Sequence, residues 1–193
     1  MMLRTFIALE IPPEIQNAIA FSTTSLRNSL PKPVVRWVAT QNLHLTLKFL
    51  GDVSPANLDR LVETLRHESA RHAGFCMPVG RLGAFPSSRR ARIIWIGLGT
   101  SAALDALQRG VEAAAGQLGY AREDRAFSPH LTIGRVGQGI SATDNQRIRT
   151  ALDATKVDQL GTVDVQAIHI FKSDLQPGEP VYTRLHSLPL RST

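Results

Sequence analysis

The chain has 193 residues, with 22 Lys and Arg against 16 Asp and Glu, which gives a formal net charge of +6. This length suits one domain or two small lobes, and a hydrophobic content of 43% excludes wholesale disorder. The single cysteine excludes an internal disulfide and a cysteine-based zinc site, and it indicates a reducing, cytoplasmic location. No stretch approaches the about 18 consecutive apolar residues that a membrane span needs, so no membrane contact is expected.

Arginine dominates the positive charge, with 18 arginines against four lysines. The planar guanidinium group binds phosphate through two hydrogen bonds at once, so this bias favours an anionic, phosphate-bearing partner such as a nucleic acid or a nucleotide. A codon usage that prefers arginine explains the same composition, because net charge bears on association rather than on chemistry.

Proline, glycine and serine divide the chain into short apolar segments, so its elements can be predicted in order. Pro13 opens the first helix, and Ser54 followed by Pro55 begins the second. In chain order, the predicted elements are a strand at 5–11, a helix at 13–30, strands at 34–38 and 43–50, a helix from 55, two strands within 79–98 around the turn 86–90, a helix at 102–118, a strand at 130–136, a helix capped by Ser141 or Thr143 and ending near Leu152, and strands at 163–171 and 181–188 around the turn 176–178.

The two halves of the chain share one pattern. The segment HLTLKFLGDVSPANLDRLVETL at 44–65 matches HLTIGRVGQGISATDNQRIRTAL at 130–152 as strand, glycine-marked turn, helix cap and amphipathic helix. We interpret this match as an internal duplication within a single domain spanning residues 1–193. Because short strands joined by tight turns favour antiparallel pairing, the predicted fold is α+β and bilobal. Two pseudo-symmetric lobes would each carry an antiparallel sheet with flanking helices, and the active-site cleft would lie between them.

The same triplet, HLT, opens both matching strands, at 44–46 and 130–132. Side chains alternate along a strand, so His44 and Thr46 share one face and the leucine between them faces the core. His130 and Thr132 share a face in the same way. A histidine and a threonine from each half are therefore predicted to point into the space between the lobes.

This pair of histidines suits displacement at phosphorus. Imidazole has an ordinary pKa of about 6.5, so one neutral and one protonated ring form a general base and a general acid. The nucleophile and the leaving oxygen lie on opposite sides of the phosphorus, and a two-fold arrangement of lobes would place His44 and His130 on those two sides. The threonine hydroxyls can donate hydrogen bonds to the non-bridging oxygens. Such a site requires neither a metal nor a covalent protein intermediate.

The segments RWVATQNLHLTLKFLGDV at 36–53 and FSPHLTIGRV at 127–136 resemble the two HxTx signatures of the 2H phosphoesterase superfamily. The resemblance is greatest to its RNA 2′,3′-cyclic phosphodiesterase branch, also described as 2′-5′ RNA ligases. TFIALEIP at 5–12 and FPSSRRARIIWIGL at 85–98 fit the same branch, so the resemblance covers nearly the whole chain. It implies hydrolysis of RNA or nucleotide 2′,3′-cyclic phosphate ends to 2′-phosphates without a metal or cofactor, and it leaves reversible 2′-5′ ligation open.

The resemblance also implies roles for the motif residues. His44 matches the first-motif histidine, the proton donor to the departing O3′, and His130 matches the second-motif histidine, the proton acceptor that activates water. Thr46 and Thr132 match the threonines that hold the phosphate. The residues alone do not distinguish the two histidines, so this direction of proton transfer rests on the resemblance.

Several neighbours of the motifs have two interpretations. Arg135 matches an arginine that often follows the second motif and adds charge to the phosphate site, but strict alternation places it on the core face unless Gly134 allows a bulge. By the same alternation Lys48 shares the face of His44, and we expect it to extend into solvent rather than to bind RNA. Phe49 is expected on the core face, and Trp37 is expected to pack rather than to stack on a base.

The other charged and titratable candidates carry less weight. The basic turn at 89–92 either steers RNA by its charge or is simply solvated. The four remaining histidines lack a following threonine or suitable ligand spacing, and we expect them to be structural or surface residues: His67, His72, His169 and His186.

Two alternative functions remain open. A non-catalytic RNA-binding module would use the basic cleft without catalysing a reaction, although the presence of both His–Thr pairs argues against loss of the catalytic residues. A metalloenzyme would use His44 and His130 as ligands, but metal sites recruit a third ligand and nearby carboxylates, which neither motif provides on the same face. The sequence therefore predicts a monomeric enzyme without metal that acts on RNA with 2′,3′-cyclic phosphate ends or on small cyclic nucleotides.

Overall fold

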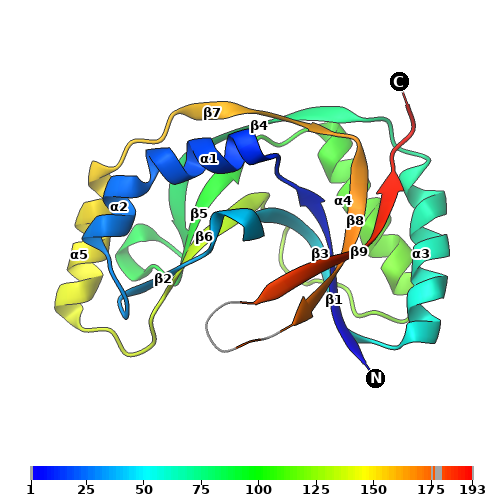
Figure 1. Cartoon of the computed structure of the whole chain (residues 1–193), viewed down its shortest axis with the longest axis horizontal. Coiled ribbons are helices and arrows are strands. Elements are labelled where there is room, and N and C mark those ends of the chain that lie inside the picture. The colour runs from blue at the N-terminus through cyan, green and yellow to red at the C-terminus, as the bar shows by residue number, and fades with distance from the viewer. Residues whose placement is uncertain (1, 175, 177–179, 193) are drawn as a thin grey trace.

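A computed structural model describes residues 2–174, 176 and 180–192 of the chain. The chain forms two antiparallel sheets that lie side by side, each with helices at its outer end (Figure 1). In strand order, the first sheet contains β3 (His44–Val53), β1 (Leu3–Glu10), β8 (Ala167–Asp174) and β9 (Val181–Pro189). The second contains β2 (Val35–Trp37), β6 (His130–Val136), β5 (Ile93–Leu98), β4 (Phe75–Phe85) and β7 (Gln159–Val165). The predicted bilobal α+β fold is confirmed.

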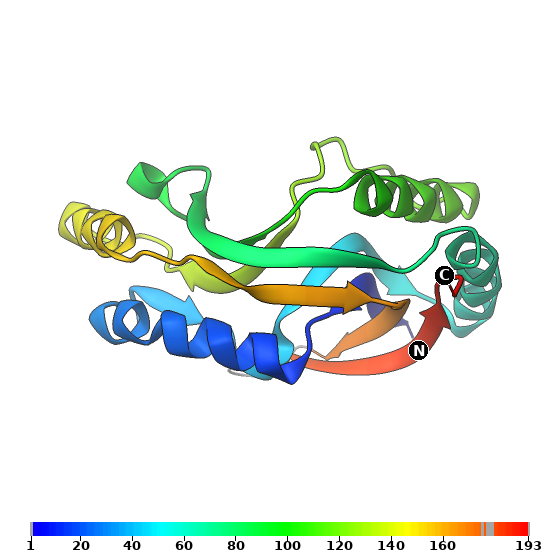
Figure 2. The ribbon, with the colours of Figure 1, turned by 90° about the horizontal axis from the view of Figure 1, so that it is seen from above.

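The helices are divided between the two lobes. Two long helices, α3 (Pro55–Ser69) and α4 (Ala102–Gln117), pack together beside the first sheet. The second lobe carries α1 (Pro13–Ser22), α2 (Thr24–Ser29) and α5 (Ala142–Ala154), and two short 3₁₀ turns at 40–42 and 88–90 complete the elements. Seen from above, β4 and β7 run side by side along the middle of the molecule (Figure 2).

Each lobe contains strands from both halves of the chain. The first sheet joins β1 and β3 to β8 and β9, and the second joins β2, β4 and β5 to β6 and β7. The two matching strand–helix units, β3–α3 and β6–α5, lie in opposite lobes. The internal duplication stays a prediction, but the interleaving means that the lobes are not successive halves of the sequence.

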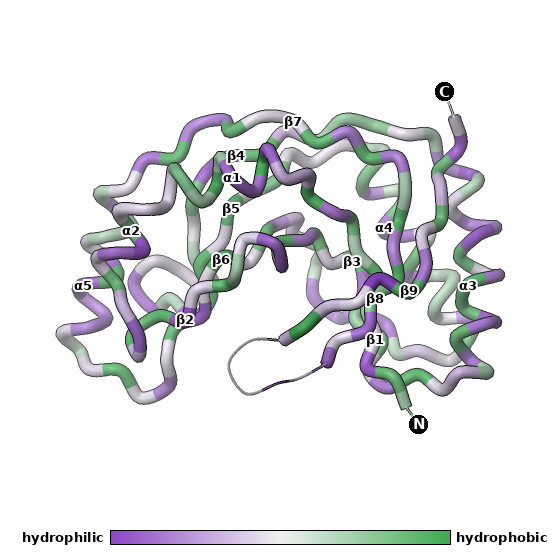
Figure 3. The backbone as a smooth tube through the Cα atoms, viewed as in Figure 1, coloured by the Kyte–Doolittle hydropathy of each residue, from purple (hydrophilic) through white to green (hydrophobic). Residues whose placement is uncertain are grey.

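Serine caps and apolar faces account for the three longest helices. Ser54, Ser101 and Ser141 each accept a hydrogen bond from the backbone N–H three residues later, so Ser141 and not Thr143 caps α5. Hydrophobic and hydrophilic residues alternate along α3, α4 and α5 (Figure 3). The buried sides of α3 and α4 pack on each other and on the first sheet, whereas α5 packs against α2 and the 3₁₀ turn at 88–90.

Two sequence predictions are wrong about where elements end. The helix expected at 13–30 is divided at Thr23, whose hydroxyl donates to the Ile19 carbonyl at 2.8 Å and so competes with regular helix geometry. The single strand expected at 163–171 is two strands, because the chain passes from one sheet to the other at Gln166. The apolar pattern continues across this crossing and gives no sign of it. The turn predicted at 176–178 lies largely outside the described residues.

Among the residues that the structure describes, no helix is long and apolar enough to cross a membrane.

A buried ion pair joins the two elements that meet behind the first sheet. The Lys48 ammonium lies 2.6 Å from a carboxylate oxygen of Glu112 on α4 and donates to the Ala121 carbonyl at 2.7 Å. Glu112 also accepts a hydrogen bond from the Glu123 backbone N–H at 3.0 Å. The prediction that Lys48 extends into solvent is therefore wrong. Its side chain is 3% exposed, and it fastens the segment before β6 to the strand that carries the first motif.

We expect Lys48→Met to destabilise the protein by about 3 kcal/mol, because it leaves the Glu112 carboxylate buried without a counter-charge. Urea unfolding measures this loss. The double variant Lys48→Met/Glu112→Gln should recover part of it, since a neutral amide needs no counter-charge. Equal losses in the single and double variants would show that the ion pair itself contributes little.

Candidate active site

A β-bulge follows each HLT triplet. Between β1 and β3, Ala8 faces Thr46 and Ile7 faces Lys48, so Leu47 is the extra residue. Between β5 and β6, Trp95 faces Thr132 and Ile94 faces Gly134, so Ile133 is the extra residue. A bulge reverses the alternation of side chains, and residues beyond it change face. The two bulges occupy the same position in the two motifs.

The bulges place Phe49 and Arg135 on the histidine faces. Phe49 is 68% exposed, and its ring lies 5.9 Å from that of Phe6, which in turn lies 4.7 Å from the His44 ring. The prediction that Phe49 faces the core is wrong. Arg135 is exposed, as the bulge interpretation required, and Gly134 instead faces the Trp37 ring on the core side.

Both motif histidines are held in the same way. Nδ1 of His44 donates to the Asn42 carbonyl at 2.7 Å, and Nδ1 of His130 donates to the Ser128 carbonyl at 2.7 Å. A carbonyl oxygen only accepts, so each Nδ1 carries the hydrogen. In the neutral ring Nε2 is then unprotonated, and in the charged ring it carries a proton that can be given away. Either histidine can therefore act as an acid or as a base through Nε2.

An aromatic ring meets each imidazole edge-on. The Tyr182 ring lies 5.1 Å from His44 at an interplanar angle of 90°, and the Phe85 ring lies 4.9 Å from His130 at 85°. Phe6 packs against the face of His44 at a tilt of 30°. These contacts, together with the hydrogen bond at Nδ1, hold the orientation of each ring.

Burial makes the charged form of His44 unfavourable. The pKa of His44 is lowered to about 4, chiefly by removal from water, which exceeds the opposing contribution of the hydrogen bond to the Asn42 carbonyl. The positive charge of Arg135 is a smaller contribution to the same lowering. Arg135 lies on β6 and His44 on β3, and these two motif strands contact each other, so the arginine lies near enough to act on the imidazole.

The threonines of the motifs share the histidine faces. Thr46 and Thr132 are partly exposed, and neither hydroxyl forms a hydrogen bond with another residue in the described part of the chain. Both hydroxyls are therefore available to a ligand, and their role in holding phosphate oxygens stays a prediction.

A cavity of about 760 Å³ lies next to His44. Its walls include Glu10, His169 and Arg184, and the Glu10 carboxylate accepts a 2.7 Å hydrogen bond from Arg184 and lies 3.6 Å from Nε2 of His169. His169 fits the expected structural role in being buried, yet it lies on the same sheet face as His44. Burial lowers its pKa, against the raising effect of Glu10.

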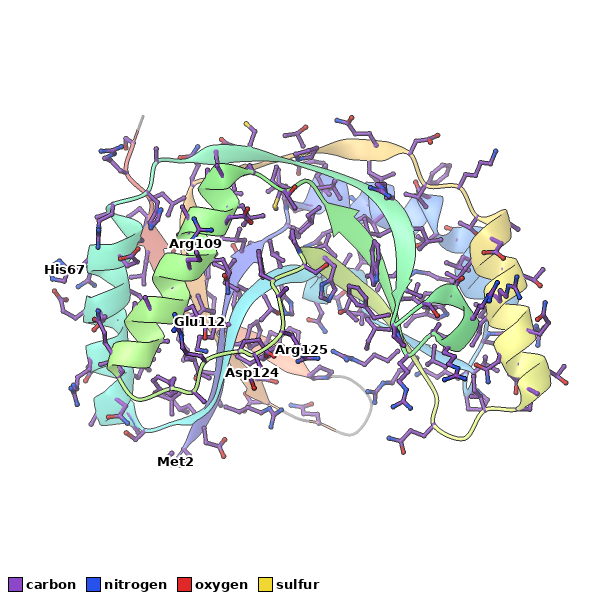
Figure 4. The ribbon with its side chains drawn as sticks, turned by 180° about the vertical axis from the view of Figure 1, so that it is seen from behind. Met2, His67, Arg109, Glu112, Asp124 and Arg125 are labelled. Atoms are coloured by element: carbon purple, nitrogen blue, oxygen red, sulfur yellow. The ribbon has the colours of Figure 1, made fainter. Side chains whose placement is uncertain are left out.

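The remaining sequence candidates lie away from these residues. Trp37 packs in the second lobe, with its indole N–H donating to the Leu30 carbonyl at 3.0 Å. His67 and His72 pair with glutamates one helical turn earlier on α3, and Figure 4 shows His67 at the outer edge of that helix. In the described ranges no group of three or more His, Cys, Asp or Glu side chains is placed to hold a metal ion.

The whole-chain pattern of a known family fits this arrangement. The sequence model of the family described as LigT like Phosphoesterase matches residues 9–95 and 98–182. This chain belongs to that family.

Individual relatives give the same assignment. The RNA 2′,3′-cyclic phosphodiesterase of Geobacillus stearothermophilus is 32% identical over 185 residues, which cover 96% of this chain and 56% of the relative, so the chain spans little more than half of its length. The RNA 2′,3′-cyclic phosphodiesterase of Methanothermobacter thermautotrophicus is 27% identical over 183 residues, covering 95% of this chain and 96% of the relative. The crystal structure of E. coli LigT complexed with 3′-AMP matches with a TM-score of 0.73 at 25% identity, over 98% of this chain and 99% of that one. The predicted superfamily and branch are confirmed, and the relatives support the prediction of a hydrolase.

The sequence missed the aromatic residues of this phosphoesterase site. Phe6 and Phe85 read as ordinary strand residues, and Tyr182 lies far from both motifs in the sequence. The signal that could have found them is the strand pairing, because Phe6 lies on β1, the direct neighbour of the first motif strand, and Phe85 lies on β4, separated from the second motif strand by β5 alone. Tyr182 on β9 comes into contact with His44 only through the three-dimensional fold.

The electrostatics of this phosphoesterase site can be tested by NMR. We expect the His44 imidazole to titrate near pH 4, well below the ordinary histidine value, because burial disfavours its charge. Arg135→Gln should raise the His44 pKa, since it removes a nearby positive charge. His67, at the outer edge of α3, provides the internal reference resonance. A His44 midpoint that does not move in Arg135→Gln would contradict the electrostatic link between the two motifs.

Proposed function

We propose that this phosphoesterase hydrolyses the 2′,3′-cyclic phosphate ends of RNA to 2′-phosphates, with His44 and His130 as general acid and general base. The proposal draws its substrate from curated relatives named RNA 2′,3′-cyclic phosphodiesterase. The complex of E. coli LigT with 3′-AMP supports a site of this fold that takes a ribonucleotide carrying phosphate on its sugar. The observation that carries the mechanism is the matched pair of Nδ1–carbonyl hydrogen bonds, which leaves both Nε2 atoms without a hydrogen bond among the described residues.

The reaction moves one proton at each side of the phosphorus. Nε2 of His130 takes a proton from water as the water oxygen forms a bond to phosphorus. The bond between phosphorus and O3′ breaks, and Nε2 of His44 gives its proton to O3′. The products are a 2′-phosphate and a free 3′-hydroxyl, with His130 protonated and His44 neutral. Proton exchange with solvent then restores the starting state. We assign the donor and acceptor from the family resemblance.

The low pKa of His44 requires the substrate to help charge it. A neutral His44 has no proton to give from Nε2, and burial keeps the free protein in that neutral form at pH 7. A phosphate anion next to the ring favours the imidazolium form and also offsets the opposing charge of Arg135. In this proposal, substrate binding raises the His44 pKa and brings in the proton that the leaving oxygen needs.

The other motif residues would hold the phosphate. The hydroxyls of Thr46 and Thr132 point to the histidine faces without another partner in the described chain, so they can donate to the non-bridging oxygens. Arg135 adds a positive charge where negative charge increases in the transition state. Neither group needs to move a proton.

We expect His44→Ala and His130→Ala each to reduce the rate by about a thousandfold, which is the scale of general acid–base catalysis. The assay follows conversion of an oligonucleotide with a 2′,3′-cyclic phosphate end to its 2′-phosphate. Activity should persist in excess EDTA, because the proposed chemistry uses protons alone. Thermal unfolding and circular dichroism of the variants serve as controls for the fold.

The same assay distinguishes the alternative functions. Binding of the oligonucleotide without conversion by the wild-type protein would indicate the RNA-binding module. Loss of activity in EDTA with recovery on adding a divalent metal would indicate a metalloenzyme. Full activity in either histidine variant would refute the two-histidine mechanism. Joining of the cyclic end to a second RNA bearing a 5′-hydroxyl would add ligation to the hydrolysis.

Phe49 provides a platform for a base next to the phosphate. Its ring is exposed, lies close to Phe6 and is carried by the strand that holds His44. Stacking of a base on an aromatic ring contributes about 1–3 kcal/mol. Hence Phe49→Ala should raise KM about tenfold with little change in kcat, and Phe49→Tyr should retain the wild-type KM.

Phe21 offers a matched control, because it is an 86% exposed phenylalanine on α1 in the other lobe. Phe21→Ala should leave the kinetics unchanged. Equal KM values for Phe49→Ala and the wild-type protein would show that no base stacks on Phe49.

A further inference from the structure

Two arginines face each other across neighbouring strands of the second lobe. Arg36 on β2 and Arg135 on β6 are direct cross-strand partners, and both are exposed. Direct partners point to the same side of a sheet, with Cβ atoms about 5 Å apart, and like charges in this position destabilise the pairing. Arg36 therefore lies on the histidine face of the second sheet next to Arg135, at a cost in stability that an anion would remove.

The flanking residues confirm this direction. Val35 and Trp37, on either side of Arg36, pack on the opposite side, where both approach the Cα of Gly134. Val35 is fully buried. Because side chains alternate along a strand, the Arg36 side chain lies on the face that carries His130 and Thr132.

A third arginine approaches from the first sheet. Arg4 on β1 alternates with Phe6, so it shares the face on which Phe6 contacts His44. The charges of Arg4, Arg36 and Arg135 all lower the pKa of Tyr182, while burial raises it more strongly. Since Tyr182 touches His44 edge-on, the three cations surround the ring that borders the proposed donor.

These arginines differ from Arg184, which also lies beside His44. Arg184 is paired with the Glu10 carboxylate at 2.7 Å. In the described part of the chain, Arg4, Arg36 and Arg135 form no ion pair with an acidic side chain. Unpaired arginines are common on protein surfaces. Here, however, two of them are direct cross-strand partners and the third lies on the other sheet, so positive charge is concentrated at one end of the site.

We propose that Arg36, assisted by Arg4, binds the phosphodiester that precedes the terminal nucleotide, so that the enzyme prefers oligonucleotide ends to mononucleotides. The inference rests on the proposed function, in which Arg135 serves the cyclic phosphate. One phosphate satisfies Arg135 alone, whereas the adjacent arginines provide positive charge for a second. A mononucleotide 2′,3′-cyclic phosphate has no second phosphate, while every longer RNA end has one.

The test compares two substrates, adenosine 2′,3′-cyclic phosphate and a dinucleotide with a 2′,3′-cyclic phosphate end. The ratio of their kcat/KM values, dinucleotide over mononucleotide, is measured for the wild-type protein, Arg36→Gln and Arg4→Gln. We expect the wild-type ratio to exceed one and Arg36→Gln to lower it about tenfold, as for loss of an exposed charge-assisted hydrogen bond. Arg4→Gln should lower the ratio by a smaller factor. Arg109→Gln is the matched control, because Arg109 lies on α4, and its ratio should equal that of the wild-type protein (Figure 4).

Salt dependence provides a second measurement. Each phosphate bound by a cation on single-stranded nucleic acid contributes about −0.7 to the slope of log affinity against log salt. The dinucleotide should therefore show a steeper slope than the mononucleotide, and Arg36→Gln should remove the difference. Thermal unfolding should show Arg36→Gln to be at least as stable as the wild-type protein, since one of two facing like charges is gone.

The outcomes separate this inference from the proposed function. If neither substrate is hydrolysed, the proposed function fails. If both are hydrolysed and the ratio is one, or is unchanged in Arg36→Gln, the proposed function stands and the second phosphate site is refuted. A loss in Arg36→Gln that is equal for both substrates would place Arg36 at the cyclic phosphate and would also refute the inference.

Discussion

The β-bulge after each HLT triplet determines which side chains reach the site. Without the extra residue at Leu47, Phe49 would turn into the core and Lys48 would lie beside His44. With it, the lysine is buried against Glu112 and the phenylalanine is exposed beside Phe6, which contacts His44. The equivalent bulge at Ile133 turns Arg135 to the histidine face. The same β-bulge in both motif strands therefore determines which aromatic and cationic side chains lie beside each motif.

The motif histidines combine a fixed tautomer with different surroundings. The same hydrogen bond from Nδ1 to a carbonyl two residues earlier holds both rings, so they present chemically equivalent Nε2 atoms. Phe6, Tyr182 and the adjoining strands bury His44 and make its charged form unfavourable. In the proposed mechanism the two rings have opposite roles, and for His44 the surroundings rather than the residue type set the protonation state of the free protein.

The sequence was sufficient where the fold depends on local pattern. The alternation of His44 and Thr46 with leucines, and the serine caps of the helices, correctly predicted the strand faces up to the bulges and most element boundaries. Periodicity could not reveal the crossing at Gln166, because the apolar pattern is the same in either sheet. It also could not show that Tyr182 meets His44, since that contact depends on how β9 reaches β1 through β8. The bulge at Ile133 was foreseeable from the adjacent Gly134, but the one at Leu47 has no glycine next to it.

The charge arrangement of the site is incomplete without a ligand. Arg36 and Arg135 lie side by side although like charges repel, and the His44 imidazole is buried in surroundings that oppose a further positive charge. Each of these features costs free energy in the free protein, and each is relieved by an anion placed between the motifs. A neutral ligand would relieve neither. In the proposed function, electrostatics therefore constrain the choice of substrate more than shape does, because a negatively charged group both pairs with the arginines and allows His44 to hold a proton.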